Sequence, residues 1–298
     1  MRRVFEGNQV FFSWFLLLVL ALIWGSSFIL MKKGLMVFSA GEVGAVRILS
    51  AALVLLPFSL PALKKLKSAH WKLLFASGLV GSFLPAFLFA TAQTRLSSSV
   101  TGILNALTPL FVLILGVFFF KQNLTKKNLL GIFIGFSGSI LLIFSGSSDN
   151  FWYGLNFFTL LVILATLFYG TNLNLIKHYL QDLSPRVITS VSLLLVGPLA
   201  ASYLIMMADF NSLFQNTGPA LKALSFILIL GVVGTGFALM LFNKLVQLTT
   251  PIFTSTVTYL IPVVALGWGL WDGEEILWNH LLGMVTIILS IYIINRQK

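Results

Sequence analysis

The chain has 298 residues, of which 58% are hydrophobic and 9% are charged, and its formal net charge is +11. Soluble domains carry about 25% charged residues, so this composition excludes a water-soluble globular protein and predicts a membrane protein. The basic residues stand in short clusters between long apolar runs, which excludes a nucleic-acid-binding face. The chain has no cysteine, so disulfides, thiolate metal sites and a cysteine nucleophile are excluded as well.

Apolar runs long enough to cross a bilayer recur along the whole chain. A transmembrane helix needs about 20 mainly apolar residues, and its backbone polar groups must be satisfied within the helix. The predicted spans are 11–31, 41–61, 72–93, 97–120, 128–145, 152–176, 184–207, 221–243, 251–271 and 278–295. We therefore expect an all-α membrane protein with ten transmembrane helices.

Loop charge predicts the orientation, because cytoplasmic loops of membrane proteins are enriched in Lys and Arg. If the N-terminus is inside and the loops alternate, fourteen basic residues fall inside and four outside. The inside set is Arg2, Arg3, Lys64, Lys65, Lys67, Lys72, Lys121, Lys126, Lys127, Lys177, Arg186, Lys244, Arg296 and Lys298. The outside set is Lys32, Lys33, Arg95 and Lys222. This asymmetry predicts that both termini are cytoplasmic, in the inner (plasma) membrane of a bacterium.

The two halves of the chain resemble each other. ALIWGSSFILMK from Ala21 to Lys32 aligns with TLFYGTNLNLIK from Thr166 to Lys177, an offset of 145 residues. Ser39, at the start of the second predicted span, aligns with Ser184 at the same offset. The alignment indicates an internal repeat.

Pro109 and Pro262 extend this match into the fourth and ninth predicted spans. We therefore divide the chain into two five-helix repeats, residues 1–145 and 146–298. An odd number of spans forces the second repeat into the opposite orientation. Inverted repeats are typical of secondary transporters, whose substrate site lies near the bilayer midplane between the halves.

Taken together, these features resemble the drug/metabolite transporter superfamily and, within it, the EamA-type ten-span permeases. The resemblance covers about residues 15–294. The residues that carry it are Trp24-Gly25-Ser26-Ser27-Phe28, Arg47, Pro109, Tyr169-Gly170-Thr171-Asn172, Pro262, and Gly273-Glu274 followed by Gly283. It implies a carrier of amino acids, other metabolites, nucleotide sugars or drugs, with a central cavity lined mainly by spans one, three, four, six, eight and nine. Lys121-Gln122 departs from the Gly-Glu-like turn that the family often has.

Polar side chains at membrane depth are costly, so each one is a candidate for the transport path. The candidates for substrate binding are Trp24, Ser27, Arg47, Gln93, Asn105, Tyr169, Asn172, Asn174 and Tyr259. Arg47 is the only ionised residue well inside a predicted span. It is expected either to bind a substrate carboxylate or phosphate, or to reach the outer interface or pair with Glu42.

The sequence thus predicts a secondary transporter of small metabolites, such as amino acids or related compounds, that works by alternating access. Export is one of the two directions of transport that the sequence leaves open. A multidrug or other solute exporter is the alternative. An intramembrane hydrolase is disfavoured because Ser26 and Ser27 lack a base at matching depth, and a channel or lipid scramblase would show no saturable counterflow. We expect no enzymatic activity, catalytic residue, metal or cofactor. The expected partners are a small-molecule substrate and membrane lipids, and nucleic acid is not expected to bind. We expect the protein to be a monomer or a weak homodimer.

Overall fold

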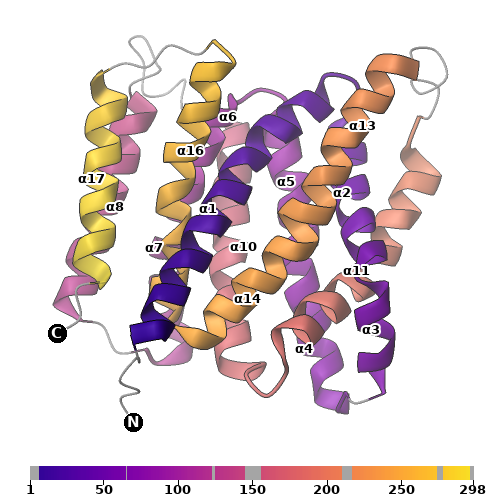
Figure 1. The fold of residues 1–298 in the computed structure, drawn as a ribbon, viewed down its shortest axis with the longest axis horizontal. Coiled ribbons are helices and arrows are strands. Elements are labelled where there is room, and N and C mark those ends of the chain that lie inside the picture. Colours follow the sequence, from indigo (N-terminus) through magenta and orange to yellow (C-terminus); the bar gives the residue numbers. More distant parts are fainter. Residues whose placement is uncertain are drawn as a thin grey trace.

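The computed structural model describes residues 7–64, 66–122, 125–144, 156–209, 217–273 and 278–295. In this part of the chain the regular structure is entirely helical (Figure 1). In chain order the elements are α1 (Gly7–Leu35), α2 (Ala40–Val54), α3 (Leu56–Leu63), α4 (Ser68–Gly78), η1 (Leu79–Phe83), α5 (Leu84–Ala92), α6 (Ser98–Leu104), η2 (Asn105–Leu107), α7 (Thr108–Phe120), α8 (Lys126–Phe144), α10 (Phe157–Tyr179), α11 (Pro185–Met207), α13 (Thr217–Gly231), η3 (Val232–Phe237), α14 (Ala238–Leu248), α15 (Pro251–Ser255), α16 (Val257–Trp271) and α17 (Trp278–Asn295). Elements η1 and η3 are π-helices and η2 is a 3₁₀ turn.

Each predicted span overlaps one or more of these helices. Residue 145 and residues 152–155, at the edges of two predicted spans, lie outside the described residues, as do the basic residues Arg2, Arg3, Lys65, Arg296 and Lys298. Seven helical segments of the described chain are long and apolar enough to cross a membrane, or eight if α2 and α3 form one span. The protein is therefore a multi-pass membrane protein.

The second predicted span, 41–61, is bent. The axes of α2 and α3 differ by 64°, and Pro57 lies in the first turn of α3. Proline is tolerated in a first turn but has no N–H to continue the hydrogen-bond ladder of a preceding helix. The apolar run alone gave no sign of this bend.

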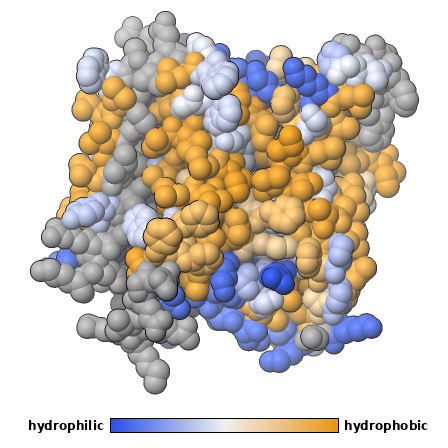
Figure 2. Space-filling view, viewed as in Figure 1, coloured by the Kyte–Doolittle hydropathy of each residue, from blue (hydrophilic) through white to orange (hydrophobic). Residues whose placement is uncertain are grey.

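The surface has the polarity that a bilayer requires. Figure 2 shows a broad apolar band across the middle of this face, with hydrophilic residues gathered toward its two ends. Large apolar side chains such as Phe11, Phe118 and Ile205 are more than 70% exposed. Contiguous exposed apolar surface of this extent would aggregate in water, whereas lipid solvates it.

Matched serines begin two of the helices. The Ser39 hydroxyl accepts a hydrogen bond from the backbone N–H of Glu42, and the Glu42 carboxylate accepts one from the N–H of Ser39, which completes a capping box at the start of α2. Ser184 caps α11 in the same way by accepting from the N–H of Val187. The predicted alignment of Ser39 with Ser184 therefore joins two equivalent helix starts.

The helices form a bundle in which α1 crosses the middle and contacts α13, α14 and α16 (Figure 1). Helix α10 packs against α5 and α7, while α8 and α17 lie side by side at one edge. The start of α1 and the end of α17 lie at the same end of the bundle. Spans three, four and eight are each interrupted by a short π or 3₁₀ segment, and span nine is broken at Thr256. Such irregular turns mark functional sites more often than regular helix does. In this bundle they lie next to the interior.

Candidate functional site

An interior cavity lies where these irregular segments meet. It is lined by Trp24, Ser27, Phe28, Met31, Arg47, Gly81, Ser82, Phe89, Asn105, Thr108, Tyr169, Asn172, Leu173, Gly234, Thr235, Leu239, Phe242, Ser255, Thr258 and Ile261. The cavity volume is about 70 Å³, well above the roughly 15 Å³ that a cavity needs to hold one water. A small metabolite is the size of ligand that suits this space.

Most of the lining consists of residues that match between the two halves of the chain. Sixteen of the twenty lining residues form pairs at offsets of 145 or 153 residues. The pairs are Trp24 with Tyr169, Ser27 with Asn172, Phe28 with Leu173, Gly81 with Gly234, Ser82 with Thr235, Phe89 with Phe242, Asn105 with Thr258, and Thr108 with Ile261. The second offset is the one that relates Pro109 to Pro262. The cavity is thus built from equivalent positions of both halves.

Six of the nine residues predicted from the sequence line the cavity: Trp24, Ser27, Arg47, Asn105, Tyr169 and Asn172. The indole Nε1 of Trp24 donates to the carbonyl of Gly234 in η3, at 2.9 Å. The Asn172 Oδ1 accepts from the Ser77 hydroxyl at 2.7 Å, whereas the Ser27 hydroxyl donates to Ile23 of its own helix. The Trp24 contact holds α1 against η3, and the Asn172 contact holds α10 against the end of α4 that precedes η1.

The other three predicted residues are buried away from the cavity lining. Gln93 donates from Nε2 to the carbonyl of Phe28, at 3.2 Å, and so joins the end of α5 to α1. Asn174 donates to the carbonyls of Val112 and Gly170 and accepts from Gln122. Tyr259 is 1% exposed and lies in an apolar cluster. In the described structure Gln93 and Asn174 link helices by hydrogen bonds, and Tyr259 packs in the bundle core.

Arg47 is the one formally charged residue of the cavity lining, and it is 9% exposed. Its Nε donates to the Thr235 hydroxyl at 2.7 Å, and this hydroxyl in turn donates to the carbonyl of Leu230 at 3.2 Å. Tyr169, another residue of the lining, is a close neighbour of the guanidinium. The pairing with Glu42 that the sequence left open is wrong, because among the described residues Arg47 contacts no carboxylate.

The Glu42 carboxylate is occupied elsewhere. Besides closing the capping box of α2, it accepts from the backbone N–H of Asp209 at 3.1 Å. The cavity lining therefore carries one positive charge and no acidic side chain. A buried guanidinium without a counter-charge is costly, and an anion in the cavity would offset that cost.

The two π-helices η1 and η3 both contribute residues to the cavity lining, and hydropathy did not identify them as site elements. Residues 78–82 read GLVGS and residues 231–235 read GVVGT. In η1, Gly81 lies against Asn172, and in η3, Gly234 lies against Ser27. The segments are related by the offset of 153 residues that also relates the two prolines, so this signal was present in the sequence.

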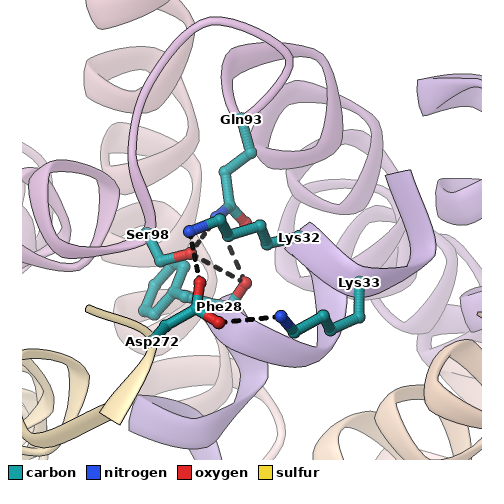
Figure 3. A network of polar contacts seen from close by, with 6 residues as sticks. All are labelled: Phe28, Lys32, Lys33, Gln93, Ser98 and Asp272. Atoms are coloured by element: carbon teal, nitrogen blue, oxygen red, sulfur yellow. Dashed lines mark hydrogen bonds and ion pairs between the residues drawn. The ribbon is translucent and has the colours of Figure 1, made fainter. Parts of the chain in front are cut away.

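A polar cluster joins four helices at one end of the bundle (Figure 3). Lys32 and Lys33, near the end of α1, donate to the carboxylate of Asp272, after α16, at 2.6 and 2.7 Å. Gln93 and Ser98 both donate to the carbonyl of Phe28, a residue that lines the cavity. The hydrogen bonds from the two lysines lower the pKa of Asp272 to about 2. This cluster ties α1 to α16 directly beside the cavity.

At the opposite end, Lys177 holds α10 to α14. Its ammonium donates to the carbonyls of Val246 and Thr249, at 2.8 and 2.6 Å. These carbonyls lie at the C-terminal end of α14, where the helix dipole attracts a cation. Lys177 and Lys32 are the matched last residues of the aligned segments, so equivalent lysines tie helices together at the two ends of the bundle.

A bundle of membrane-crossing helices around an interior cavity, whose mainly apolar lining carries a few polar side chains, defines a multi-pass helical membrane protein with room for a small solute. Residues 12–144 and residues 156–296 both match the EamA-like transporter family. The chain belongs to this family, which is part of the drug/metabolite transporter superfamily, and is therefore a membrane transporter by family. A small-molecule substrate and a membrane environment follow from that membership.

Three relatives have similar sequences. A protein from Archaeoglobus fulgidus named an uncharacterized transporter is 25% identical over 293 residues, which cover 96% of this chain and 99% of that protein. A Haemophilus influenzae protein with the same name is 31% identical over 227 residues, 74% of this chain and 72% of the relative. The uncharacterized inner membrane transporter YedA of Escherichia coli is 24% identical over 295 residues, 95% and 90% of the two chains. One crystal structure of a protein matches with a TM-score of 0.71 at 13% identity, over 95% of this chain and 96% of that chain, which shows likeness of fold alone.

Proposed function

We propose that the protein is a secondary transporter that moves a small metabolite, an amino acid or a related compound, across a bacterial inner membrane by alternating access. In this proposal the chain has ten spans, in two five-helix halves of opposite orientation (residues 1–145 and 146–298), and both termini are cytoplasmic. The observation that carries the proposal is the pairing of lining residues, since a site shared by equivalent positions of two inverted halves serves two oppositely facing states of similar energy.

The arrangement of the helices supports the ten-span topology. The candidate spans of the described chain number seven, or eight with the α2 and α3 pair. Helices α8 and α17 add 19 and 18 residues and pack against each other at the edge of the bundle. The predicted cytoplasmic end is the end where α1 starts and α17 stops (Figure 1).

Charge argues for an uncharged or anionic solute over a cationic drug. A cationic solute at this depth would need a carboxylate partner, and no acid lines the cavity. The hydroxyls that suggested a hydrolase also lack a base in the described structure. Ser26 donates to Leu22 and accepts from Trp268, and Ser27 donates within its own helix. These contacts favour a carrier over the competing functions.

Counterflow in proteoliposomes tests the proposal. Liposomes with the purified chain, loaded with a pool of unlabelled amino acids and related acids, should accumulate the labelled members that are carried, and uptake should saturate. The chain has no cysteine, so a cysteine introduced at Ser27 and coupled to a bulky maleimide should abolish counterflow. The same modification at the exposed Lys222, at the start of α13, should leave it unchanged.

Two results would overturn the proposal. Flux that rises linearly with concentration would indicate a pore. Counterflow that survives the bulky group at Ser27 would show that the solute path does not pass through the cavity.

A further inference from the structure

We infer that Arg47, Thr235 and Tyr169 form an anion subsite in the cavity and that its ligand is a small monocarboxylate without an ammonium group. This inference rests on the proposed function only for the claim that the ligand is carried, because binding itself can be measured separately. Within the proposed class of amino acids and related compounds, it favours the related monocarboxylic acids over the amino acids themselves, which carry an ammonium group.

The subsite begins with a guanidinium that is buried and held in place. Arg47 is nine-tenths buried on α2, and its Nε donates to Thr235 at 2.7 Å. The Thr235 hydroxyl donates its own proton to the carbonyl of Leu230 in α13, so its oxygen acts as the acceptor for Nε and holds the guanidinium against η3. The bond to Thr235 uses Nε alone, and Arg47 lines the cavity together with its neighbour Tyr169, so we infer that the Nη groups are available to a ligand. Nη groups presented as a fork match the two oxygens of a carboxylate.

The charge of the lining sets the charge of the ligand. Arg47 is the single formal charge among the lining residues, and a buried charge of one sign is stabilised by one opposite charge. A monoanion neutralises the cavity, whereas a dianion or a cation leaves a net charge in it. This favours a ligand with one carboxylate.

The remainder of the cavity offers little to an ammonium group. The Asn172 Oδ1 already accepts from Ser77, and the Asn105 Oδ1 accepts from Thr108 at 3.4 Å. Three phenylalanines occupy much of the other lining: Phe28, Phe89 and Phe242. An ammonium would lose its hydration without gaining a carboxylate partner. The body of the ligand is therefore apolar or neutral.

The charge of the subsite has no counterpart at the equivalent position of the other half of the chain. Arg47 aligns with Ser192 of α11 at the offset of 145 residues, and Ser192 is absent from the cavity lining. Thr235 aligns with Ser82, which lines the cavity with no matching arginine beside it. Because the other lining pairs are matched, this single unmatched charge orients the ligand with its carboxylate toward α2 and η3.

Binding to the purified full-length chain tests the inference, with four probes that share one carbon skeleton. Isocaproate is the monocarboxylate, isocaproamide its neutral isostere, leucine the zwitterion and 4-methylpentan-1-amine the cation. Isocaproate should raise the thermal unfolding temperature at millimolar concentration, and the rise should grow with the logarithm of its concentration once that exceeds the Kd. The amide, the zwitterion and the amine should each bind at least about tenfold more weakly, the loss expected when a hydrogen-bonded charge is removed or left unpaired. Inorganic phosphate is a fifth probe and should also bind more weakly than isocaproate.

Variants locate the effect. R47Q should weaken isocaproate binding about 10- to 100-fold while leaving the weak binding of the amide unchanged, and R47K should retain part of the carboxylate preference as a point charge. R95Q removes an exposed arginine between α5 and α6 and should bind isocaproate as the wild type does. If R47Q does not fold, the carboxylate-to-amide ratio of R47K against that of the wild type decides the question.

The results that would overturn the inference are distinct from those that would overturn transport. Equal binding of carboxylate and amide, tighter binding of leucine or phosphate, unchanged binding by R47Q, or no stabilisation of the wild type by isocaproate would each refute the subsite. Counterflow that persists in R47Q would refute the subsite and leave the transporter standing. Carboxylate binding through Arg47 without any counterflow would uphold the subsite and refute transport.

Discussion

Asp272 is the residue through which we expect the end of the bundle beside α16 to be held closed. Its carboxylate accepts from Lys32 and Lys33 at 2.6 and 2.7 Å, and so joins the ends of α1 and α16 next to the cavity (Figure 3). D272N removes the negative charge and leaves two adjacent lysines without it. In an alternating-access protein, such a change should shift the population toward the state open at this end.

The size of the shift follows from exposure. The Asp272 side chain is 22% exposed and the lysines are 40% and 36% exposed, so solvent screens both contacts, and each pair is worth about 0.2–1 kcal/mol. The pKa of about 2, against about 3.9 for a free Asp, corresponds to about 2.5 kcal/mol before that screening is discounted. We take about 1 kcal/mol as the net loss, which is roughly a fivefold change in the equilibrium between the two states.

Thiol labelling measures this shift directly, because the chain has no cysteine of its own. A single cysteine at Ser27, a residue that lines the cavity, is labelled with a membrane-impermeant maleimide from each side of the membrane in turn. With D272N, labelling from the side of Asp272 should be about fivefold faster, and labelling from the other side should be slower. K222Q changes an exposed lysine at the same end and should alter neither rate.

Two outcomes refute this reasoning. Equal rates with and without D272N would show that the ion pairs do not hold this end closed. Faster labelling from both sides would mean that the bundle has loosened and that access does not alternate.

Three further predictions concern stability, measured by thermal unfolding of the purified protein. Because the pKa of folded Asp272 is lowered, its contribution is present above about pH 4 and is lost as the pH falls to about 2; the wild type should therefore lose its advantage over D272N across that interval, and an advantage that persists at pH 2 would contradict this. G81A places a methyl group against Asn172 and should destabilise by about 1–3 kcal/mol, whereas G218A meets nothing within 4 Å and should be neutral; equal effects would refute the close packing of η1. N174A removes hydrogen bonds between helices and should destabilise by about 1–3 kcal/mol without changing the isocaproate-induced shift, so a lost shift would place Asn174 in the site after all.

Hydropathy was sufficient to place the helices but not to shape them. The predicted span 184–207 corresponds to α11 at Pro185–Met207 within one residue, because the cost of burying polar groups in lipid fixes where a span begins and ends. The bend between α2 and α3 and the two π-helices leave the apolar run unbroken. A count of apolar residues registers neither the proline at the bend nor the change from α-helical to π-helical turns.

Because hydropathy does not describe packing, it also could not tell which of the nine predicted residues line the cavity. The sequence gives the depth of a polar residue in the membrane, whereas its direction around the helix depends on packing. Asn172 and Asn174 are two positions apart, about 200° around the helix axis, so both could not face one cavity. The structure puts Asn172 on the cavity and turns Asn174 to the Val112 carbonyl and Gln122. Helical geometry alone separates the directions of the two side chains, while the role of each in substrate binding stays a prediction.

The repeat signal reaches further into the site than hydropathy does. The offset of 153 residues, set by Pro109 and Pro262, also brings Gly81 onto Gly234 and so aligns the two π-helices before any coordinates are known. Against that matched background a mismatch becomes informative. Arg47 faces the cavity where its partner position holds Ser192, so the charge comes from one half alone. A symmetric scaffold gives a transporter two states of similar energy. We expect the preference for a particular solute to be set by the unmatched charge, Arg47.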